Sequence, residues 1–209
     1  MKKFFDIDSP IYRLMTTIMN FAILNICWIL GSVLLITIGP ATVAACDVGL
    51  KMVDNEEGYI FRQFWKAFKN NLKQGIPLGL MAVFASYAVY LDFQIVKVLE
   101  NPSIFLIMIG ILSAVFFAAC FIYAFPLTAR YQNSLINIIR NSFRISTRFF
   151  VRTILLVLSV VIEMLAFMWN GTMMFIGVII GPASIVLTIC AFAKPIFKKL
   201  EKAQGEEEE

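Results

Sequence analysis

The chain has 209 residues, 60% of them hydrophobic, and a formal net charge of +4 at pH 7. A soluble domain of this length has about 45–50% apolar residues, so the composition argues against an ordinary soluble protein and indicates a membrane protein. Histidine is absent, which removes the commonest general base and the commonest metal ligand. The sequence also lacks the Walker, Rossmann, G-x-S-x-G and H-E-x-x-H patterns. We therefore expect no enzymatic activity, no catalytic or metal-binding residues and no cofactor.

Four long stretches of the sequence contain no charged residue, and each reaches the roughly 17–25 residues that a transmembrane helix needs. A fifth apolar stretch is interrupted only by Glu163. Backbone polar groups in lipid must be satisfied within their own segment, so these stretches predict helices. We predict an all-α, polytopic membrane protein with one membrane domain over 1–209. Its five transmembrane helices are predicted at about 14–38, 74–91, 103–125, 153–169 and 172–193, and a charged tail at 194–209.

The segment after the first predicted span stays apolar for another dozen residues before an acidic turn. Pro40 is well placed at a helix start, and Asp47, Lys51 and Asp54 share one helix face. This narrow charged stripe suits either a surface-lying connector at the membrane boundary or a groove between helices. A further alternative is a return through the membrane, giving six crossings. We favour five, because 13 helical residues cover only about 20 Å of a bilayer core of about 30 Å.

Two amphipathic connecting helices carry basic residues at helical spacing. The first has an aromatic face and a first basic stripe, defined as Arg62, Lys66, Lys69 and Lys73. The second lies within 126–148 and carries a second basic stripe, defined as Arg140, Arg144 and Arg148. Both stripes are predicted to bind anionic lipid headgroups or a partner protein.

The basic residues also predict orientation. Of the 18 lysine and arginine residues, five lie after the first predicted span, five after the third and four after the fifth. The positive-inside rule places these three segments, and the C-terminus, in the cytoplasm of a bacterial cell with an anionic inner leaflet. The N-terminus is then outside, although Lys2, Lys3 and Arg13 favour the alternative with six crossings.

Glu163 lies near the middle of the fourth predicted span. It is the only ionisable residue predicted well inside a span. A charge there costs at least about 2.5–3.5 kcal/mol, so Glu163 is predicted to face the protein interior. Ser159 lies one turn earlier on the same face, and Asn20 and Asn25 of the first span are the other polar groups that could reach it. This candidate intramembrane polar site either joins helices through hydrogen bonds or lines a ligand-binding cavity.

The plan of span, proline, polar-stripe helix, basic entry and span occurs twice, over about 14–91 and 103–169. "FKNNLK" (68–73) recurs as "FRISTR" (143–148), with aromatic and basic residues at matching positions. With five spans the two units have the same orientation, which predicts a parallel two-unit repeat.

Four segments resemble the YesL-like family of bacterial membrane proteins: "DIDSPIYRLM", "LNICWILGSVLLITIGPATVA", "VDNEEGYIFRQFWKAFKNNLKQ" and "YAFPLTARYQNSLINIIRNSF". The resemblance covers about residues 5 to 165. Members are commonly encoded beside carbohydrate ABC-transporter genes, and the family has no active site to carry over. The resemblance therefore implies an integral membrane accessory or regulatory protein associated with carbohydrate uptake. Its expected partners are ABC-transporter subunits, with no nucleic acid. The alternatives are a small transporter or channel, and a structural or chaperone-like membrane protein without ligand.

Overall fold

The structure is a computed structural model that describes residues 10–54, 56, 58–99 and 103–205. Every regular element within these ranges is a helix, which confirms the all-α prediction. Lys2 and Lys3, which bear on the predicted orientation, lie outside these ranges, as do residues 206–209 at the end of the predicted tail. In chain order the elements are α1 (Pro10–Gly31), the short 3-10 helix η1 (Leu35–Thr37), α2 (Ile38–Val53), α3 (Ile60–Asn70), α4 (Leu72–Val98), α5 (Ile104–Phe121), α6 (Ala124–Arg130), α7 (Leu135–Arg148), α8 (Phe150–Met168) and α9 (Gly171–Gly205).

Five stretches of the described chain are long and apolar enough to cross a membrane, as expected for a polytopic membrane protein. They are Leu35–Val53, Leu72–Val98, Ile104–Arg130, Phe150–Met168 and Gly171–Lys202. The first predicted span, 14–38, is wrong in its bounds, because α1 ends at Gly31 and the chain turns before α2. Glycine commonly ends helices, and hydropathy could not show the break because the sequence stays apolar through it. The apolar part of α1, Met15–Gly31, is therefore shorter than the predicted span. The first of the five candidate spans is instead Leu35–Val53, which contains α2.

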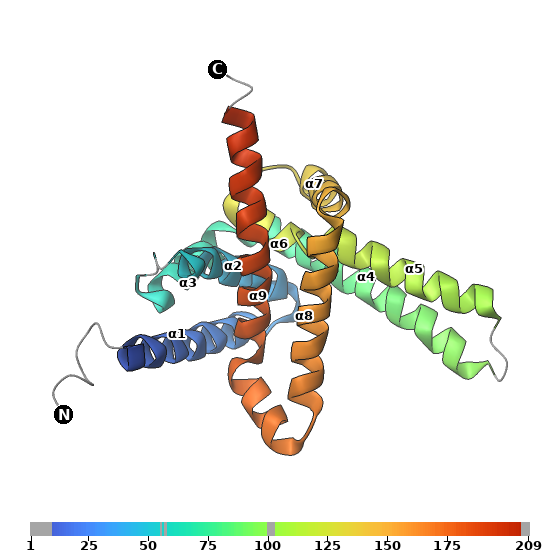
Figure 1. Cartoon of the computed structure of the whole chain (residues 1–209), viewed down its shortest axis with the longest axis horizontal. Helices are drawn as coiled ribbons and strands as arrows, with labels where there is room; N and C mark the ends of the chain where they lie inside the picture. The colour runs from blue at the N-terminus through green and yellow to red at the C-terminus, as the bar shows by residue number, and fades with distance from the viewer. Residues whose placement is uncertain (1–9, 55, 57, 100–102, 206–209) are drawn as a thin grey trace.

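The centre of the molecule is α2, which packs against α1, α3, α4, α6 and α9 (Figure 1). The interpretation of this segment as a surface-lying connector is wrong. Small buried residues, including Ala41, Ala44 and Ala45, allow neighbouring helices to approach it from several sides. Its charges gather toward its C-terminal end, where Lys51 pairs with Asp47 at 2.6 Å. The other interpretation, that this helix lies in a groove between helices, is therefore the one that fits the structure.

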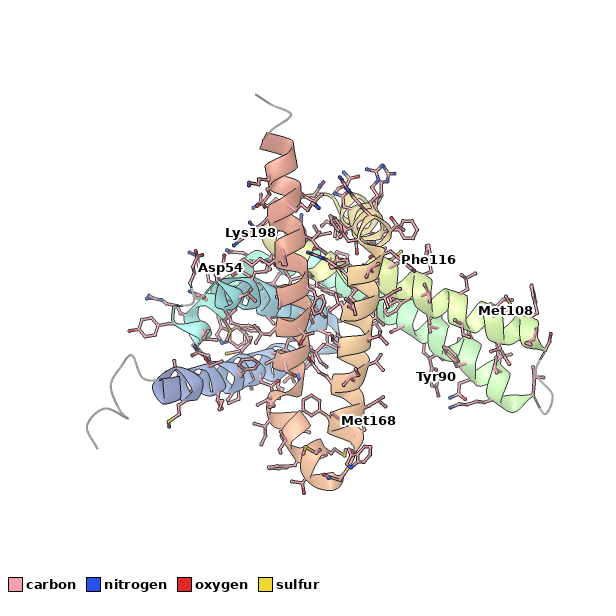
Figure 2. All side chains as sticks on the ribbon, viewed as in Figure 1. Asp54, Tyr90, Met108, Phe116, Met168 and Lys198 are labelled. Atoms are coloured by element: carbon pink, nitrogen blue, oxygen red, sulfur yellow. The ribbon has the colours of Figure 1, made fainter. Side chains whose placement is uncertain are left out.

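Three arms extend from the core around α2: α1, the hairpin of α4 and α5, and the hairpin of α8 and α9 (Figure 1). Large apolar side chains on the two hairpins are exposed, among them Tyr90, Met108, Phe116 and Met168 (Figure 2). Apolar surface of this extent needs a cover, and lipid is the cover that the composition indicates. The predicted two-unit repeat stays a prediction.

The helices α2 and α4 cross with their backbones in contact. Gly39, near the start of α2, faces Gly75 and Gly79 of α4. A Cβ on Gly39 would overlap the carbonyl oxygen of Gly75 and would lie 2.7 Å from the Cα of Gly79. Gly75 and Gly79 have the G-x-x-x-G spacing that lets membrane helices approach closely. This crossing therefore depends on the absence of side chains at all three positions.

The predicted tail begins at 194, where the structure continues α9 to Gly205. Lys194 is only 4% exposed; its ammonium pairs with Asp54 and donates to the carbonyl of Leu50, in the last turn of α2. The last carbonyls of a helix have no partner within it, so a cation at this end stabilises α2. Lys198 pairs with the same carboxylate of Asp54 at 3.1 Å (Figure 2). These contacts fasten α9 to the end of the central helix.

Asn25 fastens α1 to α9 at a break in the hydrogen bonding of α9. Pro182 has no N–H to donate to the carbonyl of Val178, four residues earlier. The buried amide of Asn25 replaces that donor, at 2.9 Å from the Val178 oxygen. Its side-chain oxygen accepts from the backbone N–H of Ala183 at 3.3 Å. Asn25 therefore satisfies both sides of the break.

We expect Asn25→Ala to lower the free energy of unfolding by about 1–3 kcal/mol, because the Val178 carbonyl loses the donor that the buried Asn25 amide supplies. In a Pro182→Ala background, the alanine N–H can donate to that carbonyl, so the same change should cost less. Thermal unfolding in detergent of the two single variants and the double variant measures this difference. Equal costs of Asn25→Ala in the two backgrounds would contradict the assignment.

Candidate functional site

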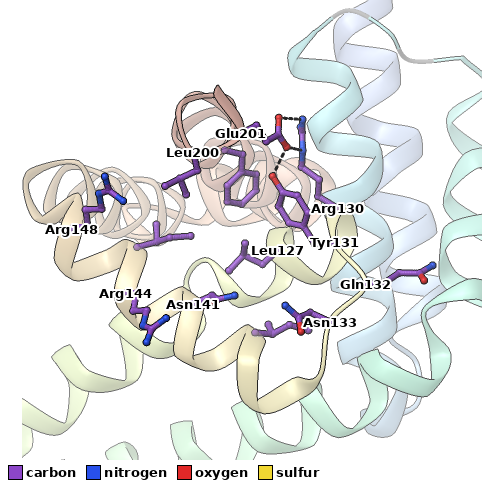
Figure 3. A pocket seen from close by; sticks show the side chains of 13 residues that line it. Leu127, Arg130, Tyr131, Gln132, Asn133, Asn141, Arg144, Arg148, Leu200 and Glu201 are labelled. Carbon is purple, nitrogen blue, oxygen red and sulfur yellow. Dashed lines mark hydrogen bonds and ion pairs between the residues drawn. The ribbon is translucent and has the colours of Figure 1, made fainter. Parts of the chain in front are cut away.

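A cavity of about 700 Å³ lies where α6, α7 and α9 meet (Figure 3). Its apolar lining comes from all three helices and consists of Leu127, Ile138, Ile145, Phe197 and Leu200. Its polar lining consists of Arg130, Tyr131, Gln132, Asn133, Asn141, Arg144, Arg148 and Glu201. The volume falls within the range of roughly 300–1,000 Å³ that small-molecule sites occupy.

One wall of this cavity is a cluster of three hydrogen-bonded side chains (Figure 3). Arg130 donates to both carboxylate oxygens of Glu201, at 2.9 Å each, and the hydroxyl of Tyr131 donates to the same carboxylate. Burial, followed by the hydrogen bond to Glu201, raises the pKa of Tyr131 to about 12, so its hydroxyl keeps its proton at neutral pH. The rings of Tyr131 and Phe197 also pack edge to face, with their centroids 5.8 Å apart. The cluster holds α6 and the following loop against α9.

The other wall is α7, which presents Arg144 and Arg148 one turn apart. The helix is fixed from behind, because Ser142 and Ser146 are buried and donate to the carbonyl of Ala119 in α5 at 3.3 and 2.9 Å. Among the described residues, no carboxylate pairs with either of the two guanidinium groups. Within the part of the chain that the structure describes, two arginines of the second basic stripe thus line the cavity without a paired carboxylate.

The third member of that stripe, Arg140, is exposed and is not part of the cavity lining. The predicted helix over 126–148 is interrupted: α6 ends at Arg130 and α7 begins at Leu135. The stripe therefore divides into two cavity residues and one that faces elsewhere.

The first basic stripe lies on α3 and the start of α4. Arg62, Lys66 and Lys69 line a shallow groove together with Phe61 and Trp65. The predicted apolar face is partly confirmed, because Phe64 is fully buried against the core, whereas Phe61 is 59% exposed. Lys73 follows the break at Asn71 and is exposed on α4, outside the groove lining.

The candidate intramembrane site has other partners than those predicted. Glu163 is half-buried and accepts hydrogen bonds from Ser184 at 3.4 Å and from Thr188, both on α9. Ser159 donates instead to the carbonyl of Leu155 in its own helix, at 2.8 Å. Asn25 instead hydrogen-bonds to the backbone of α9 at the Pro182 break, and Asn20 lies in α1. Sequence spacing alone could not reveal Ser184 and Thr188, because they lie 21 and 25 residues downstream on another helix.

Glu163 is not the only carboxylate inside a candidate span, so that expectation is wrong: Asp47 lies in α2, and Asp92 lies inside the apolar helix α4. Asp92 is part of α4, which continues to Val98 beyond the predicted end of the span at 91. The hydroxyl of Ser113 in α5 donates to Asp92 at 2.6 Å. In both hairpins, a carboxylate of the first helix thus accepts from a hydroxyl group of the second.

The fold and these sites define a polytopic α-helical membrane protein with a basic cavity beside its core. Residues 21–93 match the family model described as "Protein of unknown function, DUF624". The chain is also 28% identical, over 135 residues, to the uncharacterized protein YesL of Bacillus subtilis (strain 168). That match covers 63% of this chain and 64% of the relative, which is less than two thirds of its length. No solved structure matches the chain significantly. The two matches show that part of this chain is similar to YesL-like proteins of unknown function.

Proposed function

We propose that this chain is an integral membrane accessory or regulatory protein of a bacterial uptake system, and that it binds the system's permease subunits through the groove on α3. The observation that carries the proposal is the division of α3 into two faces. Its inner face is fixed to the core by Ile60 and Phe64. Its outer face presents three cations and the exposed ring of Phe61.

This outer face suits a partner with acidic and aromatic or apolar groups. A helix that only completed the core would bury its aromatic residues, whereas Phe61 is exposed and, with the half-buried Trp65, borders the cations of the groove. Aromatic and arginine side chains are enriched in protein interfaces, where they supply much of the binding energy. The basic segments further support a cytoplasmic location for this surface and for the C-terminus in a bacterial cell membrane.

The association with carbohydrate uptake is supported by the resemblance to the YesL-like family. A transporter or channel role is the second candidate, favoured by Asp92 in α4 and Glu163 in α8, one carboxylate in each apolar hairpin. Each of them accepts from hydroxyl groups across its own hairpin. This pairing suits the joining of two helices better than an open pathway, so the accessory role is preferred.

Affinity purification from native membranes tests the proposal. We expect sugar-permease subunits to co-purify with the wild-type chain, and their recovery to fall severalfold with Arg62→Gln, Lys66→Gln and Lys69→Gln combined. Recovery should also fall at high salt, because the Debye length is about 8 Å at physiological ionic strength and shorter above it.

A matched control removes three exposed cations elsewhere, with Lys97→Gln, Arg152→Gln and Lys202→Gln combined. Its recovery of permease subunits should equal that of the wild-type chain. Equal losses in the two triple variants, or full recovery in both, would contradict binding through the groove.

A further inference from the structure

We infer that the cavity between α6, α7 and α9 binds a phosphate monoester, carried either by a small metabolite or by a phospholipid headgroup. The inference goes beyond the proposed function, because the cavity and the α3 groove share no residue. It concerns a ligand of the purified chain and requires no protein partner.

The charges of the cavity match those of such a group. Its lining contains three arginines and one glutamate, which gives a net charge of +2. A phosphate monoester carries about −1.5 to −2 charges at pH 7. The charge of Glu201 is already matched by Arg130 within the hydrogen-bonded cluster. The two positive charges available to a ligand are therefore those of Arg144 and Arg148.

The spacing of these two arginines suits one tetrahedral anion. Residues four apart on a helix have Cβ atoms about 5–6 Å apart, so two flexible guanidinium groups can converge on a single ligand. The guanidinium group presents parallel N–H donors that bind phosphate oxygens in pairs. Because α7 is held by Ser142 and Ser146, the helix that carries these arginines is positioned before a ligand arrives.

The remaining polar lining adds donors that are neutral. Asn133 accepts from the backbone N–H of Ser134 at 2.9 Å and from Asn137 at 3.2 Å, and both bonds use its side-chain oxygen. This arrangement leaves the side-chain NH₂ of Asn133 to donate. Its backbone carbonyl also accepts from Gln74 at 3.1 Å, which fixes this loop to α4. Asn141 provides a second amide on α7. Such amides suit the ester oxygens or hydroxyl groups that accompany a phosphate.

The floor of the cavity strengthens these interactions. Leu127 and Phe197 are buried, and Leu200 lies beside them on α9. Apolar walls exclude water, and charge-assisted hydrogen bonds are stronger where the local dielectric is low. Arg130 remains engaged with Glu201, so it shapes the wall and does not compete for the ligand.

Thermal unfolding of the full chain in detergent provides the first test. Glycerol 3-phosphate is the soluble probe, and glycerol with sodium chloride at equal ionic strength is its uncharged control. Phosphatidic acid in mixed micelles is the lipid probe, with phosphatidylcholine as its control. We expect at least one phosphate probe to raise the melting temperature above its control. A shift with glycerol 3-phosphate identifies a metabolite-type ligand, and a shift with phosphatidic acid alone identifies a headgroup.

Three variants of α7 complete the test. Arg144→Gln combined with Arg148→Gln should weaken the apparent affinity for the effective probe at least about tenfold, since each removes charge-assisted hydrogen bonds. Arg144→Lys keeps the charge but loses the paired donors, so its affinity should be intermediate. Arg140→Gln removes one charge from the same helix outside the cavity and should bind as the wild-type chain does.

The inference is overturned if neither phosphate probe stabilises the chain beyond its control. It is also overturned if Arg140→Gln weakens the binding as much as the double variant does. Far-UV circular dichroism of each variant confirms that the helices are retained, and α7 depends for its packing on Ile138 and Ile145, which none of these variants changes.

Discussion

Replacement of Gly79 by alanine is expected to lower the free energy of unfolding by about 3 kcal/mol or more, although alanine is the better helix former. The added Cβ would lie 2.5 Å from the Cα of Gly39. Its nearest neighbours are backbone atoms of Gly39, which cannot rotate away as a side chain can. Overpacking of a core typically costs about 1–3 kcal/mol, and backbone against backbone belongs at the upper end or beyond. The midpoint of thermal unfolding in detergent measures the loss.

Gly110 of α5 offers a matched control for this substitution. A Cβ there would find its nearest neighbour at 3.8 Å, on the ring of Phe93, which is an ordinary contact. Gly110→Ala should therefore leave the melting temperature unchanged or slightly higher, since it gains helix propensity without a clash. A fall of equal size in both alanine variants would show that the α2 and α4 backbones do not meet as described.

Replacement of Asp54 by asparagine is expected to cause the second large loss of stability. The change leaves the ammonium of Lys194 buried at the end of α2 without a counter-charge, and an uncompensated buried charge is strongly destabilising. Asp54→Asn combined with Lys194→Met should recover part of the lost melting temperature, because no buried charge then remains. If the double variant melts below the single one, the pair does not act in this way.

Lys198→Met is the control for this pair. Lys198 contacts the same carboxylate, but its side chain is 60% exposed, and exposed ion pairs contribute little. We expect its melting temperature to stay close to that of the wild-type chain.

The pair also predicts a dependence on pH. The hydrogen bond from Lys194, above all, holds the pKa of the Asp54 carboxyl below its ordinary value of 3.8. A carboxyl with a depressed pKa in the folded chain contributes its stabilisation above the ordinary value and loses it as the pH falls through the lower one. Melting temperature should therefore fall below about pH 4 more steeply in the wild-type chain than in Asp54→Asn.

The sequence predicted the class of the fold well, because long apolar stretches and helical charge spacing are local features. The end of α1 could not be predicted, since residues 31–37 carry no charge and are mostly apolar although the helix ends there. The burial of α2 was missed because hydropathy does not distinguish an apolar surface helix from a central one. Its alanines, and the G-x-x-x-G spacing of Gly75 and Gly79, were the signs that could have predicted close packing.

The cavity could not be predicted, because its walls come from residues far apart in the sequence. The second basic stripe was expected on one continuous helix. The non-helical residues 131–134 instead separate Arg130 from α7 and leave room between the two. Glu201, which holds Arg130, lies 71 residues further along the chain. Residue spacing along one helix carries no information about such a partner.

The contacts of α9 have a consequence for the order in which the fold completes during synthesis. This helix is the last of the described helices to leave the ribosome. It supplies Lys194 to the end of α2, Glu201 to Arg130, and the break that Asn25 satisfies. Before α9 is synthesised, α2 lacks one of the helices that pack against it, and Asp54, Arg130 and Asn25 lack their α9 partners. The core described above is therefore complete only once α9 has packed against α1, α2 and α8, so folding to this structure ends after α9 is synthesised.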